Sequence, residues 1–274
     1  HVGHAYGDLS NPATSIAIND VDTLLMKIID MIDDDTILIF GGDHGMTAHG
    51  SHGGGSPQET NTALVAYHNK GFMKYQLENP DIKQIMRSVN ETKAVRQVDI
   101  VPTLAMLLGV PIPFSSMGQI LNDFYPVGKY YDAGNSPFAQ ENCPTGAILE
   151  MQMLRDNHLN TLQLVKYFKK YQKELSLFNQ EEYNTVMNLA QEIEVAYQSL
   201  EEMSQPCQNA TFHDVIISSI MKSQELSSQI YHLVSTKTPT EMTIFAQGFI
   251  LLILVATAYL LIIQYLYMTK DYEF

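Results

Sequence analysis

The stretch from Thr36 to Met46 holds the residue types best suited to chemistry in this sequence of 274 residues. Strand-forming residues at 36–40 are followed by glycines and then by Asp43 and His44. The pattern predicts a buried strand that ends in a glycine-rich corner. Neighbouring strand residues point to opposite faces, so this carboxylate and this imidazole can meet one ion only if the backbone turns, which the flanking glycines permit.

Two further histidines complete a candidate metal site. His52 lies within the glycine-rich segment 50–55, and His4 lies far upstream. Imidazole and carboxylate groups are the usual non-thiol ligands of zinc, whereas carboxylates alone would suit magnesium or calcium better. Each residue alone fits an exposed loop, so the hypothesis depends on all four together. Two ions about 4 Å apart suit phosphoryl transfer. The nearest hydroxyls, at Thr47 and Ser51, show no activating context.

Composition narrows the class of protein. The chain has 30 acidic and 16 basic residues and a formal charge of -14, which argues against a face that binds nucleic acid. A solvated acidic surface is the simplest interpretation. Cys143 and Cys207 are the two cysteines. One bridge between them in an oxidising lumen and two free buried thiols are both compatible with the sequence.

Residues 243–268 are almost entirely apolar and carry no charge. A helix that crosses a bilayer needs about 20 such residues, so this segment predicts one transmembrane helix; a buried core helix is the alternative. Tyrosines gather toward its C-terminal half, as in an interfacial aromatic belt. Sequons at Asn90 and Asn209, if glycosylated, place everything before the span in a glycosylating lumen.

Residues 1–125 predict an α/β domain. Asn11 and Pro12 open a helix whose apolar residues recur at helical spacing from Ile18 to Ile32, and Asp33–Asp35 end it. Strands are expected at 36–40 and 62–67. A short helix capped by Asp99 and stopped by Gly109 is apolar nearly all round, so we expect it to be buried.

Residues 126–146 are rich in Gly, Pro and Asn and form the expected linker. Residues 147–242 change character and predict two or three long helices. Their apolar residues follow three helical sets: Leu162, Val165, Phe168, Leu175 and Phe178; Val186, Leu189, Ile193 and Leu200; Ile216, Ile220, Ile230 and Leu233. We interpret these sets as packing faces.

Four segments occur in an order that resembles a known family. They are His1–Gly7, Gly42–Met46, Gly50–Gly54 and Val98–Phe114. Together they are similar to the lumenal domain of the glycosylphosphatidylinositol (GPI) ethanolamine phosphate transferases, in the alkaline phosphatase and nucleotide pyrophosphatase superfamily. The likeness is strong over residues 1–122. It is looser in the helical part, where it rests chiefly on His158–Leu164.

The resemblance implies the C-terminal part of an alkaline-phosphatase-like catalytic domain, then a helical lumenal segment and the transmembrane helix. It also implies two Zn²⁺ ions. His4 and His52 would hold one of them, with an Asp expected directly before His1. Asp43 and His44 would hold the other, with an Asp and the nucleophilic Thr, both expected upstream of His1. Four of seven ligands would then lie in this chain, so we expect it to be inactive alone.

The family resemblance also implies a reaction and a location. The Thr would attack phosphatidylethanolamine and release diacylglycerol, and a mannose of the GPI precursor would then accept the phosphoethanolamine. The enzyme would lie in the endoplasmic reticulum membrane with its catalytic part lumenal, with a small multispanning stabilising subunit as a further expected partner. Motif details favour the third-mannose enzyme over the second-mannose enzyme. A related phosphodiesterase or pyrophosphatase and a non-catalytic membrane-anchored protein are the alternatives.

Overall fold

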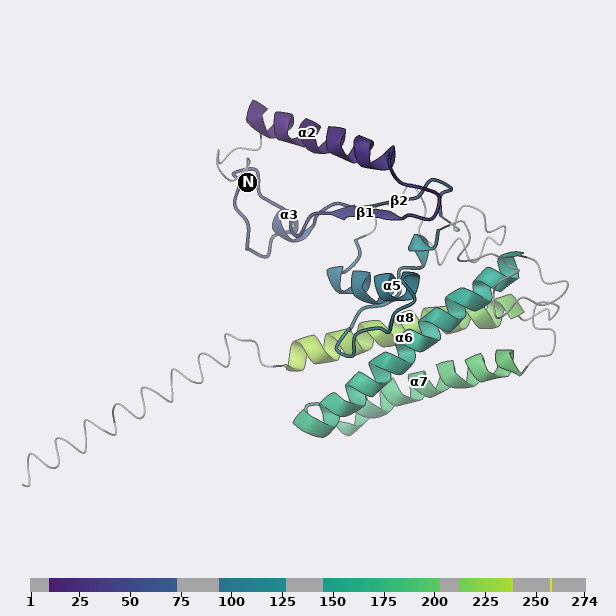
Figure 1. The fold of residues 1–274 in the computed structure, drawn as a ribbon. Coiled ribbons are helices and arrows are strands. Elements are labelled where there is room, and N and C mark those ends of the chain that lie inside the picture. Colours follow the sequence, from purple (N-terminus) through teal and green to yellow (C-terminus); the bar gives the residue numbers. More distant parts are fainter. Residues whose placement is uncertain (1–9, 73–93, 127–144, 203–211, 239–256, 258–274) are drawn as a thin grey trace, which may run out of the picture.

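The computed structural model describes residues 10–72, 94–126, 145–202, 212–238 and 257 (Figure 1). His4, Asn90, Asn209, both cysteines and, apart from Thr257, the apolar segment 243–268 lie outside the described residues. Within the described ranges, no helix is both long and apolar enough to cross a bilayer. This part of the chain is mostly helical and includes one two-stranded sheet.

The first helix, α2 (Pro12–Ile29), begins as its sequence predicts. Asn11 is its N-cap, and the Asn11 Oδ1 accepts a hydrogen bond from the Ala13 backbone N–H at 2.9 Å. The helix ends at Ile29, with Asp30 as its C-cap, which is earlier than expected, so Ile32 lies beyond it. Asp33 does not end the helix; its carboxylate accepts from the Thr36 hydroxyl at 2.7 Å and forms the next turn. No residue of α2 is buried.

Both predicted strands are present, although each is short. Strand β1 (Leu38–Gly41) pairs antiparallel with β2 (Leu64–Tyr67), with Leu38 opposite Tyr67. The prediction that the first strand is buried is wrong for the described structure, because Phe40 is 39% exposed and no residue of β1 is fully buried. The connection between the strands, residues 42–63, contains the short helix α3 (Pro57–Thr60) and most of the candidate metal ligands.

The short helix predicted between Asp99 and Gly109 is also present. The 3-10 turn η2 (Gln97–Asp99) leads into α5 (Ile100–Leu107). Gly109 ends this helix with φ +64°: its N–H bonds the Met106 carbonyl and the Val110 N–H bonds the Ala105 carbonyl, as in a Schellman motif. The expectation of complete burial is wrong. One face of α5 is buried, but Leu108, at the helix end, is 72% exposed.

Three long helices follow, as the periodicity predicts: α6 (Thr145–Leu175), α7 (Gln180–Glu201) and α8 (Phe212–Lys237). They lie side by side below the strand pair in Figure 1. Phe168 of α6 is fully buried and stacks on Phe178, at 4.6 Å between ring centroids. Two members of the first apolar set are not in the core, because Leu162 is 37% and Leu175 is 50% exposed.

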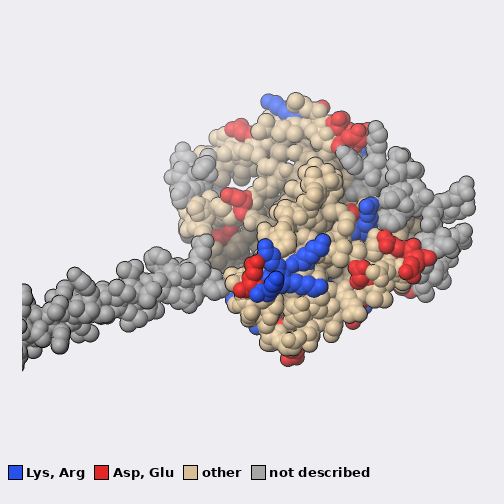
Figure 2. Space-filling view, turned by 60° about the horizontal axis from the view of Figure 1, so that its bottom comes forward, with Lys and Arg blue, Asp and Glu red and all other residues tan. Residues whose placement is uncertain are grey.

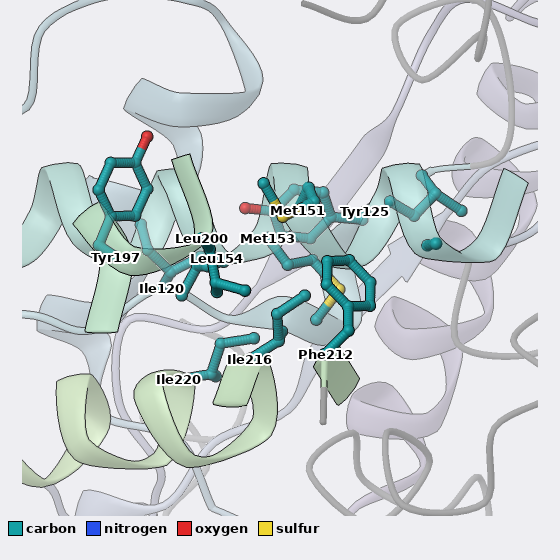
Figure 3. Close-up of a cluster of buried hydrophobic side chains, with 12 residues drawn as sticks. Ile120, Tyr125, Met151, Met153, Leu154, Tyr197, Leu200, Phe212, Ile216 and Ile220 are labelled. Atoms are coloured by element: carbon teal, nitrogen blue, oxygen red, sulfur yellow. The ribbon is translucent and has the colours of Figure 1, made fainter. Parts of the chain in front are cut away.

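A second core joins the three helices to the segment before them (Figure 3). Ile120 and Tyr125 are almost completely buried against Leu154, Phe212 and residues near them on α6, α7 and α8. Side-chain packing therefore runs across residue 125, where the sequence places the end of the α/β region. The proposed division into domains stays a prediction.

Polar contacts, some of them buried, reinforce this junction. The Asn160 amide donates to the Gly118 carbonyl at 3.0 Å, and Gln163 donates to the carbonyls of Phe114 and Ser116. Asn157 bonds the Asn122 side chain at 2.9 Å. Polar side chains of α6 thus dock the chain that follows α5. They lie at positions 157, 160 and 163, and the last two fall within His158–Leu164.

Charge is unevenly distributed over the surface. Figure 2 shows Lys and Arg side chains gathered on one face of the molecule. Lys166, Lys169, Lys170 and Lys173 are all exposed and recur at the spacing of one face of α6. The acidic balance of the whole chain therefore does not hold for this face.

Candidate functional site

The glycine-rich corner after β1 packs closely against residues 59–63, at the other end of the β1–β2 connection. The Gly42 N–H donates to the Ala63 carbonyl at 3.1 Å, and the Gly45 N–H donates to the Glu59 carbonyl at 2.8 Å. A Cβ atom at Gly45 would lie 2.0 Å from the Gln58 carbonyl oxygen. Glycine is therefore needed at position 45 for space, because the loop passes directly over α3.

This corner brings Asp43 and His44 together. The His44 N–H donates to Asp43 Oδ1 at 3.0 Å, and the His44 Nδ1 lies 2.7 Å from the Gly45 carbonyl oxygen. A carbonyl oxygen can only accept, so Nδ1 carries the proton in the neutral ring. The lone pair then belongs to Nε2, which lies 3.7 Å from Asp43 Oδ2.

A tight turn carries His52 back to the same place. The Thr47 N–H donates to the Ser51 carbonyl at 2.9 Å, and the Ser51 N–H donates to the Thr47 hydroxyl at 3.0 Å. The His52 ring consequently stands edge-on to the His44 ring, at 4.7 Å between centroids. Thr47 shapes this loop, in agreement with its interpretation as an ordinary loop residue.

The arrangement is open to solvent. The Asp43 side chain is 91% exposed and the His44 side chain is 42% exposed. Among the described residues, no group of three or more His, Cys, Asp and Glu side chains is arranged to hold a metal ion. His44 therefore contacts Asp43 in one pair and His52 in a second pair. The role of these three residues and of His4 as metal ligands stays a prediction.

Two residues near the site were not identified from the sequence. Glu59 accepts from the Ser56 hydroxyl at 2.6 Å and from the Gly54 N–H at 3.1 Å, which ties the loop of His52 to the start of α3. The Ser56 hydrogen bond is the main cause that lowers the Glu59 pKa, and the charge of His52 adds a smaller effect. The Ser56–Glu59 spacing is a capping-box signal that could have indicated this. Gln97 is the second residue, because its carboxamide donates to the Asp43 carbonyl.

Comparison with curated proteins places the chain beside one group of enzymes. It is 28% identical over 200 residues to the human protein named GPI ethanolamine phosphate transferase 3, catalytic subunit, a match covering 73% of this chain and 16% of that protein. It is 40% identical over 118 residues to transferase 3 of Eremothecium gossypii, covering 43% of this chain and 12% of the relative.

A relative named GPI ethanolamine phosphate transferase 2, from Kluyveromyces lactis, is 39% identical over 129 residues, or 45% of this chain and 16% of the relative. The chain thus spans between 12% and 16% of the length of these three relatives. No protein-family model and no solved structure matches it. The names of the relatives confirm the resemblance that the sequence motifs indicate.

Proposed function

We propose that this chain is part of a GPI ethanolamine phosphate transferase, which moves phosphoethanolamine from phosphatidylethanolamine to the third mannose of the GPI precursor. The relatives named for transferase 3 support the third mannose over the second. The structural observation that carries the proposal is the corner that sets His44 between Asp43 and His52, with its unprotonated nitrogen toward the carboxylate.

The donor set fits zinc. Ligand bonds of about 2.0–2.1 Å at a tetrahedral ion place two ligand atoms roughly 3.3 Å apart. The His44 Nε2 and Asp43 Oδ2 atoms are 3.7 Å apart, so a small rotation of the exposed Asp43 side chain brings both within reach of one ion. His52 would belong to the second ion, together with His4. In this arrangement a group of three ligands to one ion is not expected within the described residues.

When bound, the two ions supply positive charge that stabilises the phosphoryl oxygens and favours ionisation of the attacking hydroxyl. The residues of this chain would hold the ions and orient the side chains that bind them. The bond from His44 Nδ1 to the Gly45 carbonyl fixes the ring and its tautomer. Glu59 holds the loop of His52 through Gly54. The exposure of Asp43 leaves room for a bulky lipid headgroup.

The wider setting follows from the same proposal. Strand β1 would be one strand of an alkaline-phosphatase-like sheet, and residues 243–268 would anchor the domain in the endoplasmic reticulum membrane with the site in the lumen. That placement keeps the site near two lipid substrates. The proposal also includes glycans at Asn90 and Asn209, a small multispanning stabilising subunit, and a nucleophilic Thr outside this chain.

The test is a pair of histidine variants in the full-length protein that contains this chain. His44→Ala should lose bound zinc and transfer of phosphoethanolamine to GPI. His49→Ala is the matched control, because His49 is an exposed histidine of the same loop, and it should keep both. Zinc is measured by elemental analysis, and the product by mass spectrometry of the glycan.

Equal zinc content in the two variants would overturn the assignment of His44. Transfer to water in place of a mannose would show the related phosphodiesterase, and a product modified on the second mannose would show the other transferase. Turnover by residues 1–274 alone would contradict the expectation that the remaining ligands lie outside this chain.

A further inference from the structure

One contact joins the loop that carries Asp43, His44 and His52, residues 42–55, to a distant part of the chain. The Gln97 side-chain amide donates to the main-chain carbonyl of Asp43, 54 residues away in sequence. Gln97 is exposed and lies at the start of η2, so its side chain reaches the loop from a separate element. The Asp43 carboxylate, in contrast, contacts the neighbouring residue His44, through the His44 N–H and Nε2. Gln97 is therefore a long-range restraint on the backbone of this candidate ligand.

The turn that carries Gln97 is fixed by an ion pair between Arg96 and a buried carboxylate, that of Asp99. The Arg96 Nη2 donates to Asp99 Oδ1 at 2.8 Å and the Arg96 Nε donates to Asp99 Oδ2 at 3.3 Å. The Asp99 side chain is only 1% exposed and also accepts from the backbone N–H groups of Arg96 and Gln119. A buried carboxylate with this many donors holds its surroundings firmly, because any displacement would leave charge unpaired.

The helical segment holds the same ion pair from the other side. The Arg96 guanidinium lies over the Tyr231 ring of α8, 4.6 Å from its centroid, and its Nη2 is 3.4 Å from the Ser227 hydroxyl. Ser227 is fully buried. Contacts thus run from α8 through Arg96 and Asp99 to Gln97, and from Gln97 to Asp43.

We propose that Gln97 is a positioning residue for the zinc site, held in place by the Arg96–Asp99 pair and α8. This inference rests on the proposed function for the role of zinc. Its physical basis is that a fixed Asp43 carbonyl limits the directions in which the Asp43 and His44 side chains can point. Outer groups that orient metal ligands typically change metal affinity by about 10–100-fold. Because Gln97 acts through the main chain, we expect the low end, about 10-fold.

The experiment compares two glutamine variants of the full-length protein. Gln97→Met removes the donor and keeps the length of the side chain. Gln163→Met is the matched control, since Gln163 also donates its amide to backbone carbonyls, but in the segment 114–116. Zinc dissociation constants are measured by competition with a chromophoric chelator, and the ligand field by the absorption spectrum of the Co²⁺-substituted protein.

Gln97→Met should bind zinc about 10-fold more weakly, with an altered cobalt spectrum, whereas Gln163→Met should match the wild type. Amide hydrogen exchange in the metal-free proteins supplies a readout that does not need zinc. The amides of residues 43–47 should exchange about 2–10-fold faster in Gln97→Met, as expected for one lost hydrogen bond.

The outcomes separate the two proposals. If the wild type binds no zinc but Gln97→Met still speeds exchange at 43–47, the proposed function fails and the positioning contact stands. If the wild type binds zinc and Gln97→Met shows the same affinity, spectrum and exchange, the positioning role is overturned while the proposed function stands.

Discussion

A single methyl group at position 45 would test how far the loop of residues 42–55 depends on its contact with α3. In Gly45→Ala the Cβ would lie 2.0 Å from the Gln58 carbonyl oxygen and 2.3 Å from the Asn61 carbonyl oxygen, where real contacts stay above 3.0 Å. Both obstacles are backbone atoms, so no side-chain rotation relieves them. The loop or α3 must move by about 1 Å, and a misplacement of that size costs on the order of 100-fold in rate.

Under the proposed function, Gly45→Ala in the full-length protein should reduce kcat for phosphoethanolamine transfer roughly 100-fold, with zinc bound more weakly. The matched control is Gly55→Ala, because a Cβ at Gly55 meets no atom within 4 Å, and this variant should keep wild-type kcat. The melting temperature of both variants should stay close to that of the wild type, since the loop lies outside both cores. Equal kcat for the two variants would refute the argument that backbone contact with α3 sets the loop.

Two further predictions concern the helical segment. Phe168→Ala should lower the free energy of unfolding by about 3–5 kcal/mol, because this ring is fully buried. Leu162→Ala should lower it by less than about 1 kcal/mol, because Leu162 is 37% exposed. Thermal or denaturant unfolding compares the two variants, and equal losses would contradict the packing. Burial raises the pKa of Asp156 to about 6 against the hydrogen bond from Tyr125. The folded pKa is above the unfolded value of 3.8, so stability should fall by on the order of 3 kcal/mol as pH rises from about 4 to 7. Asp156→Asn should remove most of this slope, and an unchanged pH profile would refute the burial argument.

The local signals of the sequence were sufficient for most elements. Asn11 and Pro12 predicted the start of α2, and Gly109 predicted the end of α5. Periodicity predicted two or three long helices, and the structure has three. Each of these signals acts through residues within about one turn of one another, so the sequence alone expresses them. The glycines around Asp43 likewise predicted a corner because their conformational freedom is a local property.

Exposure and long-range contact could not be predicted in the same way. Periodicity shows which face of a segment is apolar, but not which neighbour covers it, and Leu162 and Phe168 differ for that reason. The capping-box spacing indicates the bond between Ser56 and Glu59, but it does not show that Glu59 also accepts from the Gly54 N–H in the loop of His52. Gln97 was hidden because its partner is 54 residues away.

The sequence by itself determined the positions of most helices and strands, the corner at Asp43 and His44, and the likeness to the transferases. The tertiary structure decided that His52 returns to His44, that Gln97 reaches Asp43, and that the chain after α5 docks on α6. The physical reason is that turns and caps depend on neighbouring residues, whereas these contacts form only when separate elements pack together and the gain from burial and hydrogen bonding exceeds the entropy lost in closing the loops between them.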